Sequence, residues 1–179
     1  MTHTKQVGRR KFLRAAAAGA VAGAAVGCNR STGPYRFLTL REATTLEAIC
    51  GQIIPEDQAP GAAQASAIQY IDRQLTGKFK DQAKVYRAGL AAIDAMAGGD
   101  FATLPAEQQI AILHRVERDD SMRQFFDAVI AHSMQGFYGN PRHGGNRDFV
   151  SWQMLGIPVT QVRGRDRYEF PQGARREKS

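Results

Sequence analysis

The sequence of 179 residues is poor in the residue types that hold redox cofactors. Its only cysteines are Cys28 and Cys50. Haem attachment requires a C-x-x-C-H motif and iron–sulfur clusters require several cysteines, so neither centre fits this chain. The chain also has neither the G-x-G-x-x-G nor the G-x-x-x-x-G-K-[ST] motif of nucleotide-binding loops. We therefore expect no cofactor bound by this chain alone.

Metal ligands and catalytic groups are also scarce. His114 and Glu117 are spaced to share a helix face, but a di-metal bundle needs two Glu-x-x-His motifs and further glutamates, and zinc needs three or four donors. We therefore interpret His114 and His132 as surface or hydrogen-bonded helix residues. His143 is suited to acid–base chemistry by its type, yet no serine or cysteine stands beside it as a nucleophile. No metal-binding or catalytic residue is predicted.

Sustained period-two alternation is absent, so no sheet is expected, whereas apolar residues recur at helical spacing. The pattern predicts helices over about 40–53, 63–75, 81–97, from 103–105 onward, and over 121–137. Thr39 and Glu42 fit a capping box at the first start. The fold class is thus all-α, a compact domain of about five helices with a long Gly/Pro/Arg-rich loop and a further short helix near 148–155. The apolar faces comprise Leu40, Ala43, Leu46, Cys50 and Ile53; Ile68, Ile71 and Leu75; Tyr86, Leu90, Ile93 and Ala97; Ile110, Leu113 and Val116; and Met122, Phe126, Val129, Ile130, Ser133 and Phe137.

The formal net charge of +7 is concentrated at the amino terminus. Five of the 24 basic residues precede residue 28 with no acid among them, which leaves 19 basic against 17 acidic residues, a net of +2. A nucleic-acid-binding domain should keep a basic face of its own. Nucleic acid is therefore not an expected partner.

Residues 1–28 read as an export signal of the twin-arginine type. Arg9 and Arg10, followed by Phe12 and Leu13, precede an Ala/Gly/Val run over 15–27 that is too short for a membrane span of roughly 20 residues. The layout is that of a signal with an apolar central region. Twin-arginine signals are addresses read by a translocase that exports folded proteins, so the folded chain is expected in the periplasm.

The end of this signal has two interpretations. Ala25-Val-Gly-Cys28 resembles a lipobox, in which Cys28 becomes the lipidated first residue and anchors the chain in a membrane. Alternatively, cleavage follows the A-x-A type site Ala22-Gly-Ala24. A polar linker over 29–37 then leads into a helical domain over 38–158, and an extended basic tail covers 159–179.

Cys50 also has two interpretations. It lies on the apolar face of the first helix, where a buried, inert thiol is the usual state. If Cys28 is lipidated or removed, however, Cys50 is the odd cysteine of an exported protein and becomes a candidate for an intermolecular disulfide.

The least ordinary stretch is the loop from Gly136 to Pro158. Its glycines and Pro141 disfavour a helix and favour a tightly folded loop. Aromatic and polar side chains on such a loop suit recognition of a partner. The alternative interpretation is a loop that only caps a helix and covers the core. The residues we select as a candidate partner interface are Phe137, Tyr138, Asn140, Pro141, Arg142, His143, Gly144, Gly145, Asn146, Arg147 and Trp152.

Together these segments resemble one protein family. The twin-arginine leader, the stretches Leu38-Thr-Leu-Arg-Glu42 and Ile53-Ile-Pro55, the loop Gly136-Phe-Tyr-Gly-Asn-Pro-Arg-His-Gly-Gly-Asn-Arg-Asp148 and the stretch Ser151-Trp-Gln-Met-Leu-Gly-Ile-Pro158 are similar to the gluconate 2-dehydrogenase subunit 3 family. This family supplies the small subunit of bacterial FAD-dependent sugar and polyol dehydrogenases. The resemblance spans about 38–158.

The resemblance implies a helical, non-catalytic partner of a large GMC-type flavoprotein that holds the FAD and lacks an export signal of its own. The small subunit would escort this flavoprotein through the twin-arginine translocase, and a cytochrome c or another electron acceptor often completes such complexes. Two other classes stay open. One is a lipid-anchored scaffold or acceptor-docking module without an escort role. The other is an independent exported enzyme that uses His143 and the arginines.

Overall fold

The computed structural model describes residues 34–158 of the chain. In that range the chain forms α-helices and short 3₁₀ turns and contains no strand, which confirms the all-α fold class. The expectations for the signal over 1–28 and for the tail over 159–179 concern residues outside the described range.

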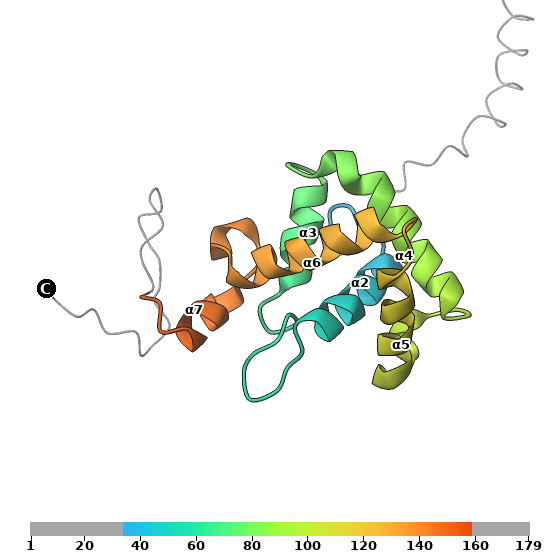
Figure 1. Cartoon of the computed structure of the whole chain (residues 1–179). Helices are drawn as coiled ribbons and strands as arrows, with labels where there is room; N and C mark the ends of the chain where they lie inside the picture. The colour runs from blue at the N-terminus through green and yellow to red at the C-terminus, as the bar shows by residue number, and fades with distance from the viewer. Residues whose placement is uncertain (1–33, 159–179) are drawn as a thin grey trace, which may run out of the picture. The chain divides into compact units, whose positions relative to one another are not determined.

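Helix α2 (Leu40–Ile53) lies at the centre of the domain, where it contacts α3, α4, α5 and α6 (Figure 1). Its start is fixed by the expected capping box. The Thr39 hydroxyl accepts from the Glu42 amide at 3.2 Å, and the Glu42 carboxylate accepts from the Thr39 amide at 2.8 Å. A capping box satisfies two of the free backbone amides at the start of a helix. The start of α2 that the sequence predicted is therefore correct.

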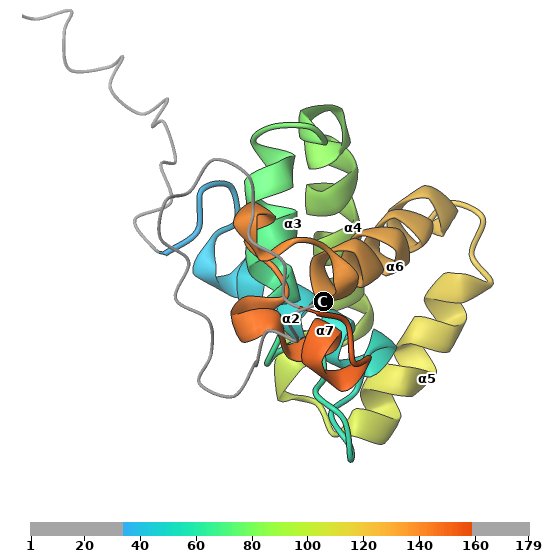
Figure 2. The same ribbon diagram turned by 90° about the vertical axis from the view of Figure 1, so that its left-hand side faces the viewer.

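The remaining helices follow in chain order around α2, and α7 lies beside the carboxyl-terminal end of α6 in both views (Figures 1 and 2). Their bounds are α3 (Ala67–Leu75), α4 (Ala83–Met96), α5 (Ala106–Glu117), α6 (Arg123–Tyr138) and α7 (Val150–Met154). The 3₁₀ turns are η1 (Lys80–Gln82), η2 (Phe101–Thr103), η3 (Pro141–His143) and η4 (Arg147–Phe149). None of the helices in the described range is long and apolar enough to span a membrane.

Helix α3 begins later than the sequence pattern suggested. The expected start near residue 63 is wrong because the chain first passes through a turn that places Ser66 in the left-handed conformation, with φ of 53°. The turn itself is reached through Gly61, where a Cβ would lie 2.6 Å from the Glu56 amide nitrogen. Periodicity of apolar residues continues across such a turn, so it does not reveal the break.

Some residues assigned to the apolar faces are exposed instead. Leu40, Ile110 and Ile130 have 62%, 43% and 37% of their surface exposed, and Phe126 is only partly buried. On α6 the residue that enters the core is Phe125. Its ring packs directly against Gly89 of α4, where an added Cβ would lie only 2.2 Å from Phe125 Cγ. Because Gly89 opens this space on α4, the buried face of α6 is rotated from the one that periodicity favoured.

The amino-terminal end of the domain is held by a buried carboxylate. Asp72 on α3 is 1% exposed and accepts from three consecutive backbone amides, those of Arg36 at 2.7 Å, Phe37 at 2.9 Å and Leu38 at 3.0 Å. Residues 36 and 37, which the sequence placed in the linker, are therefore fixed to α3. The Arg87 guanidinium covers the Phe37 ring at 4.6 Å.

Candidate functional site

The loop after α6 starts with a turn that Asn140 and Gly144 define. The Asn140 side chain accepts from the Arg142 amide at 3.1 Å, while Pro141 occupies the first position of η3. Gly144 ends the turn with φ of 109°, a conformation that favours glycine. The expectation of a tightly folded loop over this stretch agrees with these turns.

Two glycines allow the loop to fold back on α6. A Cβ at Gly145 would lie 2.0 Å from the Gly136 carbonyl oxygen, so only glycine permits this approach of two backbones. Gly136 in turn faces α3, where a Cβ would lie 3.0 Å from the carbonyl oxygen of Ala67. The loop, α6 and α3 are therefore packed backbone to backbone.

The loop is closed by the side chains of Asn146 and Ser151. The Asn146 amide group donates to the Gly139 carbonyl oxygen at 3.0 Å and accepts from the Ser151 amide at 3.0 Å. The Ser151 hydroxyl donates to the Phe137 carbonyl oxygen at 2.6 Å. Both side chains are buried, so loss of one of these hydrogen bonds would leave a polar group unpaired in the interior and destabilise the loop.

Three of the residues selected as partner contacts therefore face the interior of this chain. Phe137, Gly145 and Asn146 are buried, and the last two hold the loop closed. They can shape a recognition surface but do not present their side chains on it. Sequence reasoning grouped them with the exposed residues because an aromatic ring or an amide in a glycine-rich loop looks the same in either role.

The loop presents the other selected residues at or near the surface. Exposed side chains are those of Tyr138, Arg142, His143 and Arg147. Arg142 Nε donates to His143 Nε2 at 2.9 Å, which holds the guanidinium and the imidazole side by side. Half-buried residues of the set are Asn140, Pro141, Gly144 and Trp152.

Trp152 joins α7 to the end of α6. Its indole Nε1 donates to the Tyr138 carbonyl oxygen at 2.8 Å, and its ring lies 5.5 Å from that of Phe149. The backbone that delivers it is strained, because Asp148 and Phe149 both have positive φ, 53° and 58°. Strain of this kind persists only where the surrounding contacts over-determine it.

The reactive groups elsewhere in the domain have structural partners. His132 is buried, its Nδ1 shares a 2.8 Å hydrogen bond with the Tyr86 hydroxyl, and its ring stacks on Phe79 at 3.9 Å. Burial, and then the nearby Lys78, lower the pKa of His132. The expectation of a hydrogen-bonded helix histidine is confirmed for it. His114 is exposed and lies 3.4 Å from Glu117.

Of the two interpretations of Cys50, the structure supports the buried, inert thiol. It is 2% exposed, and its sulfur lies 3.2 Å from the Ser133 hydroxyl. Burial raises the pKa of Cys50 to about 12, so the nucleophilic thiolate is scarce. An intermolecular disulfide is contradicted by this burial, because a second sulfur cannot reach the thiol in the folded domain.

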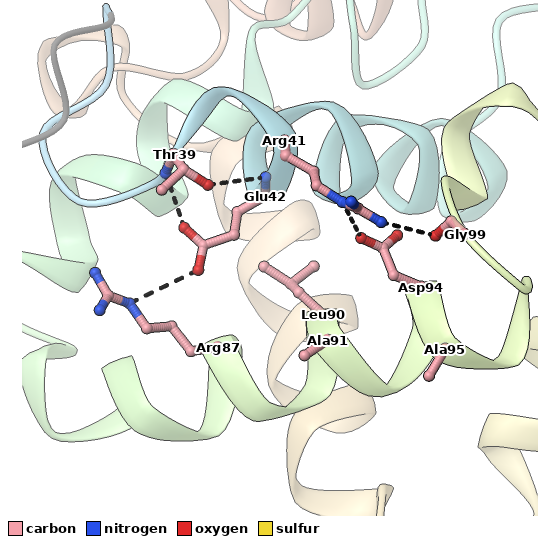
Figure 3. A pocket seen from close by; sticks show the side chains of 9 residues that line it. All are labelled: Thr39, Arg41, Glu42, Arg87, Leu90, Ala91, Asp94, Ala95 and Gly99. Carbon is pink, nitrogen blue, oxygen red and sulfur yellow. Dashed lines mark hydrogen bonds and ion pairs between the residues drawn. The ribbon is translucent and has the colours of Figure 1, made fainter. Parts of the chain in front are cut away.

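A hollow of about 410 Å³ lies between the start of α2 and one side of α4, away from the loop (Figure 3). Its charged groups are paired with one another. Arg41 donates to Asp94 at 2.9 Å and to the Gly99 carbonyl oxygen at 3.0 Å, and Arg87 lies 3.7 Å from Glu42. The arrangement fixes α2 on α4. Within residues 34–158, no group of three or more His, Cys, Asp or Glu side chains is placed to hold a metal ion.

Comparison with known protein families decides where this fold belongs. The model of the family described as gluconate 2-dehydrogenase subunit 3 matches residues 40–158. The chain belongs to the gluconate 2-dehydrogenase subunit 3 family. Searches of curated proteins and of solved structures found no match.

The range matched by the gluconate 2-dehydrogenase subunit 3 family covers nearly all of the described domain, from α2 to the end of the loop. Sequence reasoning missed Asp72, which holds residues 36–38 just before that range, and Ser151, which helps to close the loop near its end. A signal for Asp72 was present. Asp72 follows Ile68 by four residues and precedes Leu75 by three, so it lies on the apolar face of α3. An acidic residue on that face is either buried or interrupts the apolar surface.

Proposed function

We propose that this family member is the non-catalytic small subunit of a periplasmic, membrane-associated FAD-dependent dehydrogenase of the GMC type, such as gluconate 2-dehydrogenase. It binds the large flavoprotein subunit, which carries the FAD and the substrate site. The observation that carries the proposal is the family match over residues 40–158, which includes both the helical body and the loop.

The exposed part of the loop supports this binding role. Tyrosine, tryptophan and arginine are the residue types most enriched among energetically dominant interface residues. Tyr138, with 40% of its surface exposed, Arg142, Arg147 and the half-buried Trp152 supply these types on one rigid segment. A segment held by backbone contacts and buried side chains loses little entropy when it binds.

The states of the reactive side chains support a non-catalytic role. Cys50 is kept as a thiol, and His132 is committed to Tyr86 in the core. His143 is exposed and accepts from Arg142. Chemistry in the complex is then supplied by the flavoprotein, and this chain contributes binding.

The export signal completes the proposal. Arg9 and Arg10 address this chain to the twin-arginine translocase, and the folded flavoprotein bound to it is carried along. Cys28 is either lipidated, which holds the complex at the membrane, or removed with the signal. A cytochrome c subunit is a further expected member of the complex.

Purification of the carboxyl-terminally tagged chain from periplasmic and membrane fractions of its host tests the binding. We expect a large subunit with flavin absorbance to co-purify. Arg142→Ala combined with Trp152→Ala should abolish this while circular dichroism shows intact helices. Trp152→Phe serves as the matched control, because it keeps an aromatic ring at this position and loses the hydrogen bond to Tyr138. A colourless single band from the wild-type chain would remove the proposal.

A second experiment tests the escort role. Replacement of Arg9 and Arg10 by lysine should leave both this chain and the flavoprotein in the cytoplasm. If deletion of the chain leaves the flavoprotein exported but detached from the membrane, the chain is a scaffold or acceptor-docking module instead. Turnover by the purified single chain would identify it as an enzyme.

A further inference from the structure

Arg73 on α3 reaches the loop although about 70 residues separate the two in sequence. At Gly144 a Cβ would lie 2.8 Å from Arg73 Cδ, 3.0 Å from its Nε and 3.1 Å from its Nη1. The guanidinium of Arg73 therefore rests against the backbone of the loop, next to Arg142 and His143. All three side chains are exposed.

The loop continues along the same helix toward its start. The Arg147 amide donates to the Ala65 carbonyl oxygen at 3.0 Å, just before α3 begins. Three exposed arginines from two elements thus lie on this loop or against it. We call Arg73, Arg142 and Arg147 the arginine cluster.

No acidic side chain in residues 34–158 forms an ion pair with a member of this cluster. Three exposed arginines elsewhere in that range do have acidic partners: Arg41 pairs with Asp94, Arg87 with Glu42 and Arg123 with Asp120. Arg36, Arg115 and Arg118 are exposed without such a partner but are not grouped on the loop. The acid next to Arg73 in sequence is Asp72, whose two oxygens are occupied by backbone amides in the interior.

The cluster also stands out against the charge of the domain that carries it. Residues 34–158 contain 12 Lys and Arg against 14 Asp and Glu, a net of −2. A local excess of arginine on a slightly acidic body does not follow from composition. Arginine also presents several N–H groups in a fixed fork, which suits bidentate bonds to carboxylates.

We propose that the arginine cluster docks an acidic surface of the flavoprotein subunit, and that Arg73 is an interface residue together with Arg142 and Arg147. This inference rests on the function proposed above and adds the chemistry of the partner: Asp and Glu side chains placed to receive three guanidinium groups. Tyr138 and Trp152 supply apolar contacts nearby. Complementary charge of this kind raises the association rate and fixes the orientation of the two subunits.

The test compares charge variants of Arg73 in the full chain, co-expressed with the flavoprotein in the host. Arg73→Glu should weaken binding at least tenfold, Arg73→Gln less, and Arg73→Lys least, because only lysine keeps the charge. Arg115→Glu on α5 is the matched control, since Arg115 is exposed, forms no ion pair within residues 34–158 and lies outside the loop and α3. Binding of the wild-type complex should also weaken as salt is raised, and this dependence should be smaller for Arg73→Gln.

The outcomes separate this inference from the proposed function. If the wild-type chain retains no flavoprotein, the proposed function fails. If the wild-type chain binds and Arg73→Glu binds equally well, only the acidic docking surface fails. Arg73→Glu must keep the wild-type helical content and Trp152 fluorescence, and if it does not, Arg73→Gln decides. Loss of binding to vesicles of anionic phospholipid with unchanged binding to the flavoprotein would reassign the cluster to a membrane surface and overturn the proposal.

Discussion

Replacement of Asp72 by alanine should loosen the amino-terminal end of the domain and lower its stability by about 2–4 kcal/mol. The substitution removes the acceptor for the amides of Arg36, Phe37 and Leu38. Each bond to an ionised group contributes roughly 1.5–3 kcal/mol, so three bonds set an upper limit of about 5–9 kcal/mol.

The actual loss is smaller because the segment can detach. Residues 36–38 lie at the edge of the described domain, and their amides can turn to water if Leu38 leaves the core. Leu38 is fully buried, and burial of one leucine side chain contributes about 1.5–3 kcal/mol. The packing of Phe37 under Arg87 is lost with it. Detachment is therefore the lower-energy response, and it limits the effect of the substitution.

Urea denaturation followed by circular dichroism measures the change, and hydrogen exchange locates it. The amides of Arg36, Phe37 and Leu38 should lose protection before the rest of the domain does. Asp72→Asn, which keeps one acceptor oxygen, should fall between the wild type and Asp72→Ala. Asp127→Ala, at an exposed position on α6, is the control and should change stability by less than about 0.5 kcal/mol. If Asp72→Ala lowers stability no more than the Asp127→Ala control does, and hydrogen exchange at residues 36–38 is unchanged, the reasoning is refuted.

Three further predictions concern the loop, a central helix and the core. Gly145→Ala should destabilise the domain by about 1–3 kcal/mol or more, because the new methyl group meets the Gly136 carbonyl oxygen at 2.0 Å. Trp152 is the single tryptophan of the chain, so its fluorescence should report the opened loop. In Gly51→Ala the methyl group of a central helix meets no atom within 4 Å, so urea denaturation should show a gain of about 0.5–1 kcal/mol; a gain for both substitutions would contradict the close approach. The lowered pKa of His132 means that the unfolded chain binds a proton more readily, so stability should fall as pH drops below about 6.5, the unfolded value. Denaturation between roughly pH 5 and pH 7 should show a smaller decrease for His132→Gln, and equal slopes in the two proteins would rule this out.

The sequence carried enough information for the helix order but not for their exact faces. Helix α2 was located to the residue because Thr39 and Glu42 act locally, within one turn. The burial of Phe125 in place of Ile130 depends on the space that Gly89 leaves on another helix. Such a contact joins residues far apart in the chain, and periodicity within one helix does not contain it.

The candidate site shows the same division. That a glycine- and arginine-rich loop follows α6 was predictable, since turn residues act locally. Which of its side chains point inward was not, because Asn146 is buried by hydrogen bonds to Gly139 and Ser151 that form only in the folded loop. Arg73 could not be assigned to the loop from the sequence at all. Nothing in its own helix distinguishes it from a solvated arginine.

Asp72 and Arg73 are neighbours on α3 that hold different parts of the chain. Asp72 fixes the backbone of residues 36–38, which follow the proposed export signal in sequence, and Arg73 rests against the loop that we propose to meet the partner. One turn of one helix thus links the point where the translocase would pull with the point where the cargo would be attached. In the proposed export, a pulling force on the leader would reach the loop through this turn of α3.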